Sequence, residues 1–138
     1  EAVRGGKLAV LLELETGTHR IADTEVRIDH TGMHEFFFVS RDTGHRLVEG
    51  YRSHDFFMWY DPEADYITPL LGSVIHAEEW RPILSSGVVS WGAEGGPAGA
   101  VSEREFGEGL FRLCQVSLAG RTVNPQARLF ALRLLGIV

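Results

Sequence analysis

The side chains that could do chemistry in this 138-residue chain are scattered, and few spacings bring them together. Among the six histidines, His30 and His34 are four residues apart. That spacing puts two side chains on one face of a helix, but the surrounding residues indicate a strand, a turn and a second strand. His76 has Glu78 and Glu79 nearby, and no further ligand can be located. We therefore predict no metal site.

Acidic residues offer two other kinds of site, and neither is complete. Asp61, Glu63 and Asp65 alternate as at the start of a calcium-binding loop. That loop needs glycine at its sixth position, where this chain has Tyr66, and a glutamate at its twelfth position is missing. A glycosidase needs two carboxyl groups that face one sugar across a cleft, and no acid pair can be placed in this way. We interpret the acidic segment as a turn.

The candidate nucleophiles are no better placed. Cys114 lies in an apolar segment, which is typical of a buried and unreactive thiol. No serine has the glycine pattern of a nucleophile elbow, and residues 85–87 (Ser-Ser-Gly) are expected to form a turn. The glycine-rich residues 92–99 lack the spacing of a dinucleotide-binding loop and are expected to form a flexible hairpin loop. The residues alone predict no catalytic set and no cofactor.

Aromatic residues remain as candidates, because sugars stack on exposed rings. Residues 56–60 (Phe-Phe-Met-Trp-Tyr) predict a strand whose alternate side chains lie on opposite faces, with Phe56 on one face and Trp59 on the other. Trp59 and Trp91 are our candidate carbohydrate-binding residues. The competing interpretation is that these rings pack in the core.

The composition excludes several classes of protein. Nineteen acidic against thirteen basic residues give a net charge of −6, which disfavours nucleic-acid binding. A single cysteine excludes an internal disulfide framework, and 44% hydrophobic residues allow a packed core in one domain over residues 1–138. No apolar run reaches the roughly 18 residues of a membrane-spanning helix, and no signal peptide is visible. We expect no membrane partner and a cytoplasmic location.

The elements that would position these residues begin with a helix end and a strand. Residues 1–4 are typical of the last turn of a helix, which Gly5-Gly6 would end. Residues 7–14 contain a continuous apolar run, typical of a strand that is buried on both faces inside a sheet rather than at its edge. Because a natural domain rarely starts in this way, we favour a fragment of a longer polypeptide over a short native N-terminus.

A helix is predicted over residues 124–136. Asn124 suits the N-cap and Pro125 the first helical position. An apolar stripe follows at helical spacing, formed by Ala127, Phe130, Ala131, Leu134 and Leu135. Leu129 and Leu132 fall on the opposite side, so this helix is apolar nearly all round. We expect the chain to self-associate or to expose an apolar patch near its ends.

The middle of the chain is predicted to be mostly β. Residues 26–30 alternate like a half-buried strand, and a turn at 31–32, a strand at 33–40 and a polar loop at 41–44 follow. Further strands are expected at 73–80 and 81–89, and a hairpin of 100–106 and 110–118 around the glycines of 107–109. These elements predict a mixed sheet that contains 7–14 and 110–118, with the C-terminal helix against it.

Three stretches of the chain resemble a known family. The first, residues 3–11 (VRGGKLAVL), is similar to a helix-to-strand step of class I glutamine-amidotransferase-like domains. The second and most specific comprises 38–50 (FVSRDTGHRLVEG) and 55–61 (DFFMWYD). The third comprises 106–109 (FGEG), 115–118 (QVSL) and 124–127 (NPQA). Together they resemble the C-terminal region of bacterial proteins related to glycoside hydrolase family 2, the β-galactosidase and β-mannosidase group.

The resemblance implies an α/β fold: a mixed, β-rich sheet with few helices and a partial class I glutamine-amidotransferase-like or flavodoxin-like architecture. It implies a non-catalytic C-terminal accessory domain of a larger hydrolase in carbohydrate metabolism. Such a domain would pack on the catalytic domain of the parent enzyme or form a homo-oligomer. The alternatives are a carbohydrate-binding module that uses exposed aromatic residues and, third, an enzyme in its own right.

Three departures from the family pattern limit what is carried over. Arg46 follows His45 where related domains usually have proline. The nucleophile elbow of amidotransferase-like domains has no counterpart here, and Cys114 does not match its cysteine. The sugar-cleaving glutamates belong to a separate barrel domain that is absent from this chain. The resemblance therefore assigns no catalytic residue.

Overall fold

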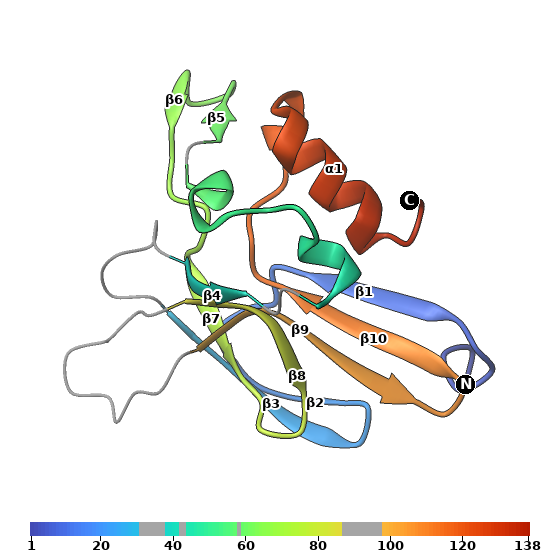
Figure 1. Cartoon of the computed structure of the whole chain (residues 1–138). Coiled ribbons are helices and arrows are strands. Elements are labelled where there is room, and N and C mark those ends of the chain that lie inside the picture. The colour runs from blue at the N-terminus through green and yellow to red at the C-terminus, as the bar shows by residue number, and fades with distance from the viewer. Residues whose placement is uncertain (31–37, 42–43, 58, 87–97) are drawn as a thin grey trace.

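The computed structural model describes residues 1–30, 38–41, 44–57, 59–86 and 98–138, and its main feature is one mixed sheet (Figure 1). Its eight strands are β1 Leu8–Leu12, β2 Gly17–Ile21, β3 Thr24–His30, β4 Phe38–Arg41, β7 Ser73–His76, β8 Arg81–Ser86, β9 Ala98–Phe106 and β10 Gly109–Cys114. They follow the order β1-β10-β9-β7-β3-β2, and β8 and β4 branch from β9. The β1–β10 pair is parallel and the other described pairs are antiparallel. The expected mixed, β-rich sheet with few helices is confirmed.

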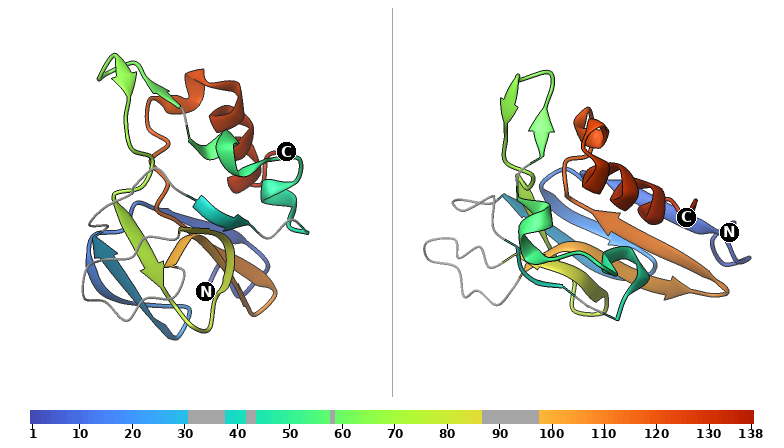
Figure 2. Two further views of the ribbon diagram at one scale, coloured as in Figure 1. Left: turned by 60° about the vertical axis from the view of Figure 1, so that its left-hand side comes forward. Right: turned by 45° about the horizontal axis from the view of Figure 1, so that its top comes forward.

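A second layer covers one face of this sheet (Figure 2). It consists of helix α1 Pro125–Leu134 and the short 3-10 helices η1 Arg46–Val48, η2 Ser53–Phe56 and η3 Arg121–Val123. A small two-stranded sheet, β5 Tyr60–Asp61 and β6 Tyr66–Ile67, projects from the body beside the start of α1 (Figures 1 and 2). The chain is thus a sheet with one helical layer and a projecting hairpin.

The core consists of two apolar clusters on opposite faces of the sheet. The larger cluster lies under the helical layer and includes Cys114, Phe130 and Leu134. The smaller cluster on the other face includes Ile28, Trp80 and Leu113. Leu113 and Cys114 are neighbours in β10 and belong to different clusters, because successive side chains of a strand point to opposite faces.

Strand β1 lies at one edge of the sheet, which corrects the prediction of a strand inside it. Residues 8–11 are half-buried, and Leu12 is 49% exposed. Val10 packs against the larger cluster and Leu11 against the smaller one. The apolar run therefore reflects contacts on both faces of an edge strand, and it does not require a neighbouring strand on each side.

The aromatic run at residues 56–60 is not a strand, contrary to our prediction. Phe56 ends η2, and among the described residues of this run only Tyr60 belongs to a strand. Phe56 and Trp59, which alternation would place on opposite faces, both point into the larger cluster. The Asp55 carboxylate accepts the backbone N–H of Arg52 at 2.6 Å, and this contact closes the first turn of η2. The chain leaves η2 after Phe56, and the indole N–H of Trp59 donates back to the carbonyl of Asp55 at 2.8 Å, which holds the Trp59 ring on the same side as Phe56.

Smaller differences concern the turns. Residues 2–6 form turns rather than a helix end, and Gly6 takes a φ of 93° while its N–H donates to the carbonyl of Val3 at 3.0 Å. Ser85 and Ser86 belong to β8, so the turn predicted there is wrong. The predictions for residues 31–37, 42–43 of the polar loop, 87–89 and most of the glycine-rich segment lie outside the described residues.

The predicted hairpin and the predicted C-terminal helix are both confirmed. β9 and β10 pair in the expected antiparallel register around Gly107 and Glu108. The helix spans residues 125–134, and its stripe of Ala127, Phe130 and Leu134 is fully buried. Leu135, which we assigned to the same stripe, is 49% exposed because it follows the last helical residue.

Candidate functional site

The structure places Trp59, our first candidate carbohydrate-binding residue, in the core. Its side chain is 2% exposed, its indole N–H donates to the carbonyl of Asp55 at 2.8 Å, and its ring lies 5.8 Å from that of Phe56. A ring that stacks on a sugar must offer one face to solvent, and Trp59 offers none. Trp91, the second candidate, lies outside the described residues.

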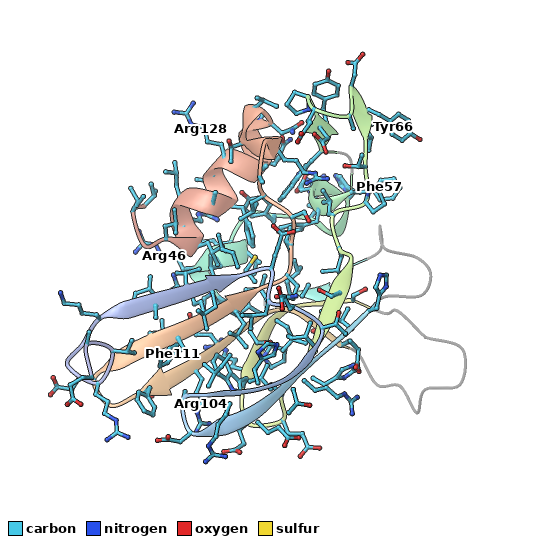
Figure 3. The ribbon with its side chains drawn as sticks, turned by 180° about the vertical axis from the view of Figure 1, so that it is seen from behind. Arg46, Phe57, Tyr66, Arg104, Phe111 and Arg128 are labelled. Carbon is cyan, nitrogen blue, oxygen red and sulfur yellow. The ribbon has the colours of Figure 1, made fainter. Side chains whose placement is uncertain are left out.

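Among the described residues, the large aromatic side chains that are exposed lie elsewhere, on the projecting hairpin. Tyr66 is 68% exposed and Tyr60 is 39% exposed. The hairpin register pairs Tyr60 with Ile67 and Asp61 with Tyr66. Because successive side chains alternate, the two tyrosines lie on opposite faces of the hairpin and do not form one stacking platform. Figure 3 shows Tyr66 directed outward.

A polar junction attaches this hairpin to the body. The Asp61 carboxylate accepts the N–H of Glu63 at 3.0 Å and lies 3.2 Å from the guanidinium of Arg121. Hydrogen bonds from backbone N–H groups and the Arg121 charge hold the pKa of Asp61 below its usual value, against the effect of desolvation. The Asn124 side chain exchanges two hydrogen bonds with the backbone of Tyr60, at 3.1 and 2.9 Å. The acidic segment is thus a structural turn, as expected.

A second polar network lies between the helical layer and the sheet. Arg112 Nε donates to Glu103 Oε2 at 2.7 Å, and His45 Nε2 lies 3.1 Å from Glu103 Oε1. The backbone N–H of Leu47 donates to His45 Nδ1 at 3.1 Å, so Nδ1 carries the lone pair and Nε2 the hydrogen. The side chains of His45, Glu103 and Arg112 are all at least 86% buried.

This network also closes the C-terminal end of α1. Arg112 Nη1 donates to the carbonyls of Arg133 at 3.1 Å and Leu134 at 2.9 Å, which are among the carbonyls that a helix leaves unpaired. A positive group is also favourable at a helix C-terminus. The network therefore links η1, β9, β10 and α1, and the Arg112 side chain also lines a small hollow of about 270 Å³ beside the C-terminal residues.

Sequence reasoning did not find this network, although one signal was present. Glu103 and Arg112 are directly opposite each other in the predicted β9–β10 hairpin, so the register alone would have paired their charges. His45 lies 58 residues from Glu103 in the sequence. No local pattern could therefore have added it.

A groove of about 620 Å³ lies on the opposite face of the sheet. Glu25, His76, Glu78 and Glu79 are among its lining residues. His76 Nε2 lies 3.1 Å from Asp29 Oδ2, while all three glutamates are exposed. The structure thus gathers the acids near His76, but as solvated side chains without the buried environment that tunes a general acid.

Cys114 is fully buried in the larger cluster, as predicted. Burial raises the pKa of its thiol to about 12, which keeps the thiol protonated and unreactive. Its Sγ lies 3.8 Å from the carbonyl of Val116. This residue packs and does not act as a nucleophile.

We expect Cys114 to make stability fall with pH above about 8.5. An unfolded thiol loses its proton near that pH, whereas the folded thiol keeps it, so the unfolded state is favoured as pH rises, by up to about 1.4 kcal/mol per pH unit. Urea unfolding at pH 8, 9 and 10 measures this slope. In Cys114→Ala the slope should be visibly smaller, and an equal slope in both proteins would contradict the burial of the thiol.

The remaining unusual feature is the free edge of β1. In the described part of the chain, β10 is its one strand neighbour. The C-terminal end of α1 lies above this edge (Figure 1), where an added Cβ on Gly136 would lie 3.2 Å from Leu8. Large apolar side chains are exposed on β1 and after α1, namely Leu12, Leu135, Ile137 and Val138. The predicted exposure of apolar residues near the chain ends is therefore observed, and Leu129 adds to it at 38% exposed.

Comparison with known proteins assigns neither a family nor a fold to this chain, because no family model, curated protein or solved structure matches it. Within the described residues, no three His, Cys, Asp or Glu side chains lie close enough together to hold a metal ion. None of the described helices has the length and apolar character to cross a membrane. A functional proposal must therefore come from the residues and their contacts.

Proposed function

We propose that this chain is a non-catalytic accessory module of a family 2 glycoside hydrolase. Its role is to pack against the catalytic domain of the parent enzyme or against another subunit. The proposal starts from the three stretches that resemble the C-terminal region of bacterial β-galactosidase-like and β-mannosidase-like proteins. The parallel β1–β10 pair beside α1 would be its amidotransferase-like part.

The observation that carries the proposal is that these stretches bind one another. The first stretch (residues 3–11) contacts the third stretch at residues 106–109, in the β9–β10 turn. There the carbonyl of Arg4 accepts the N–H of Glu108 at 3.0 Å. A Cβ on Gly109 would lie 1.9 Å from the carbonyl oxygen of Val3, so only glycine fits there. Residues that carry this part of the resemblance, such as Gly109, thus allow two backbone segments to approach closely.

The second stretch (residues 38–50 and 55–61) contacts residues 124–127 of the third stretch at the start of α1. Asn124 binds both backbone groups of Tyr60, and Tyr51, between the two parts of the second stretch, donates its hydroxyl to the carbonyl of Gln126 at 2.6 Å. An active site would direct several of its polar groups into an open cleft. The polar groups of Tyr51 and Asn124 are instead bonded within the chain, which supports a packing role.

Carbohydrate binding through aromatic rings, the alternative function, has less support. It requires a row of solvent-facing rings, whereas Trp59 is buried and the two exposed tyrosines lie on opposite faces of their hairpin. We expect no heat of binding when β-linked galactose or mannose oligosaccharides are titrated into the chain. Millimolar or tighter binding would favour the alternative.

The test of the proposal is the full reading frame in which residues 1–138 occur. The proposal requires a family 2 catalytic barrel in the same polypeptide or in a protein that forms a stoichiometric complex with the chain. Deleting residues 1–138 from that enzyme should lower its melting temperature or change its subunit number. A frame with no barrel and no barrel-containing partner would contradict the proposal.

We predict that the isolated chain has no glycosidase activity, because the glutamates that line the groove are exposed and lack the buried environment that raises the pKa of a general acid. The measurement is hydrolysis of aryl β-galactosides and β-mannosides by purified protein. The double variant Glu78→Gln/Glu79→Gln is the control, since these acids line the groove. Turnover that this variant abolishes would show that the chain is an enzyme.

A further inference from the structure

The free edge of β1 has backbone groups that point away from the sheet. The carbonyl of Lys7 accepts the N–H of Leu110 at 3.1 Å, and the N–H of Glu13 donates to the carbonyl of Cys114 at 2.8 Å. Lys7, Glu13 and the odd-numbered residues between them therefore face β10. Because backbone groups alternate in direction along a strand, those of Leu8, Val10 and Leu12 form the open edge.

This edge lacks the charges, prolines and bulges that natural proteins use to block strand pairing, although the end of α1 lies over one face of β1 near Leu8. Free edges are protected by proline, by bulges, by inward-pointing charges or by a covering element. Residues 8–12 (LAVLL) contain neither a charge nor a proline, and β1 pairs with β10 in continuous register without a bulge. An unprotected apolar edge of this kind is suited to pairing with another strand.

We propose that this edge binds the same edge of a second copy of the chain, in an antiparallel pair whose two-fold axis passes through Val10. This register pairs Leu8 with Leu12 of the partner subunit, and Val10 with Val10 of the partner subunit. All outward-facing residues of both copies then exchange backbone hydrogen bonds. A shift by two residues in either direction leaves an outward-facing residue of each copy without a partner, so the backbone selects this register.

The charges that flank β1 favour the same arrangement. The register brings Lys7, directly before β1, near Glu13 of the partner subunit, where the chain turns out of the strand with a φ of 45°, so that opposite charges lie close at both ends of the pair. A parallel pair in register would instead bring like charges together, which destabilises neighbouring strands. The Lys7 ammonium has no bond to a described residue, and Glu13 is exposed, with Oε1 accepting the Ser117 hydroxyl at 2.6 Å. Both charges can therefore reach a partner.

This proposal goes beyond the accessory function and does not depend on the nature of the parent enzyme. It requires only that β1 keeps its place beside β10. A failure of the dimer would leave the accessory role open, and the absence of a catalytic barrel in the reading frame would leave the dimer open. The two proposals are thus tested separately.

The test is sedimentation equilibrium of the 138-residue chain over a concentration series at low salt. We expect a dimer, and we expect both Lys7→Glu and Glu13→Lys to weaken dimerisation about tenfold or more, because each brings like charges close together at both ends of the pair. The double variant Lys7→Glu/Glu13→Lys restores opposite charges and should restore the dimer. Arg20→Glu and Glu25→Lys, exposed charges on β2 and β3 of equal charge change, are the matched controls and should have no effect.

Disulfide trapping tests the register directly. Residues paired by backbone hydrogen bonds in antiparallel strands have Cα atoms about 5.5 Å apart, within the range that a disulfide spans. Val10→Cys should therefore form a covalent dimer under mild oxidation, whereas Ala9→Cys, which does not face its own copy, should not. The proposal is overturned by a monomer at every concentration. It is equally overturned by a dimer that is insensitive to both single charge reversals or is not restored by the double variant.

Discussion

Replacing Arg112 with methionine is expected to lower the free energy of unfolding by about 3–5 kcal/mol. Methionine keeps much of the side-chain volume but removes the hydrogen bonds to Glu103 and to the carbonyls of Arg133 and Leu134. The Glu103 carboxylate is only 13% exposed, so it would remain buried with His45 as its one side-chain partner. Urea unfolding followed by tryptophan fluorescence measures the loss.

Two further variants separate the charge effect from a general effect of losing arginine. Arg128→Met removes an exposed arginine from α1 and should change stability by no more than about 0.5 kcal/mol. Adding Glu103→Gln to Arg112→Met removes the unpaired charge and should recover part of the loss, as expected for coupled residues. A loss below about 1 kcal/mol in Arg112→Met would show that the network contributes little.

Phe130→Ala is expected to destabilise the chain by about 3–5 kcal/mol. The Phe130 ring is fully buried and stands edge-on to the ring of Phe56, with centroids 5.3 Å apart. The rings of Tyr51 and Trp59 lie 6.3 Å away, so alanine would open a cavity among three other aromatic side chains. The same denaturation assay gives the magnitude, and loss of the near-ultraviolet circular dichroism of Trp59 would report the local change.

Leu129 provides the matched control for this substitution. It precedes Phe130 in α1 but is 38% exposed, so Leu129→Ala should cost no more than about 1 kcal/mol. Phe130→Leu, which keeps most of the volume, should fall between the two alanine variants. Equal effects of Phe130→Ala and Leu129→Ala would mean that α1 does not bury its predicted face.

The elements that could be predicted from sequence are those whose signals are local. Asn124-Pro125 and the apolar stripe at helical spacing place α1 to within two residues of its observed end. The alternation of residues 26–30 and the glycines of 107–109 place β3 and the β9–β10 hairpin. In each case the period of the side chains and the turn residues agree.

The errors arise where a pattern fits more than one tertiary environment. The apolar run of β1 predicts burial on both faces, and it is satisfied by two clusters at an edge as well as by a central position. The aromatic residues near Trp59 have strand propensity, but contacts with α1 favour a 3-10 turn there. The His45–Glu103–Arg112 network could not be predicted, because its members come from separate elements.

The parallel pairing of β1 with β10 has a consequence for biosynthesis. Leu14, directly after β1, is held by the Gln115 side chain 101 residues later in the sequence. At a translation rate of about 5–20 residues per second, the apolar segment of β1 would wait roughly 5–20 seconds for the strand that covers it. During that time, neighbouring nascent chains on one polysome expose the same apolar β1 segment, whose edge is free to pair. We therefore expect this segment to be a site of aggregation or of chaperone binding during synthesis.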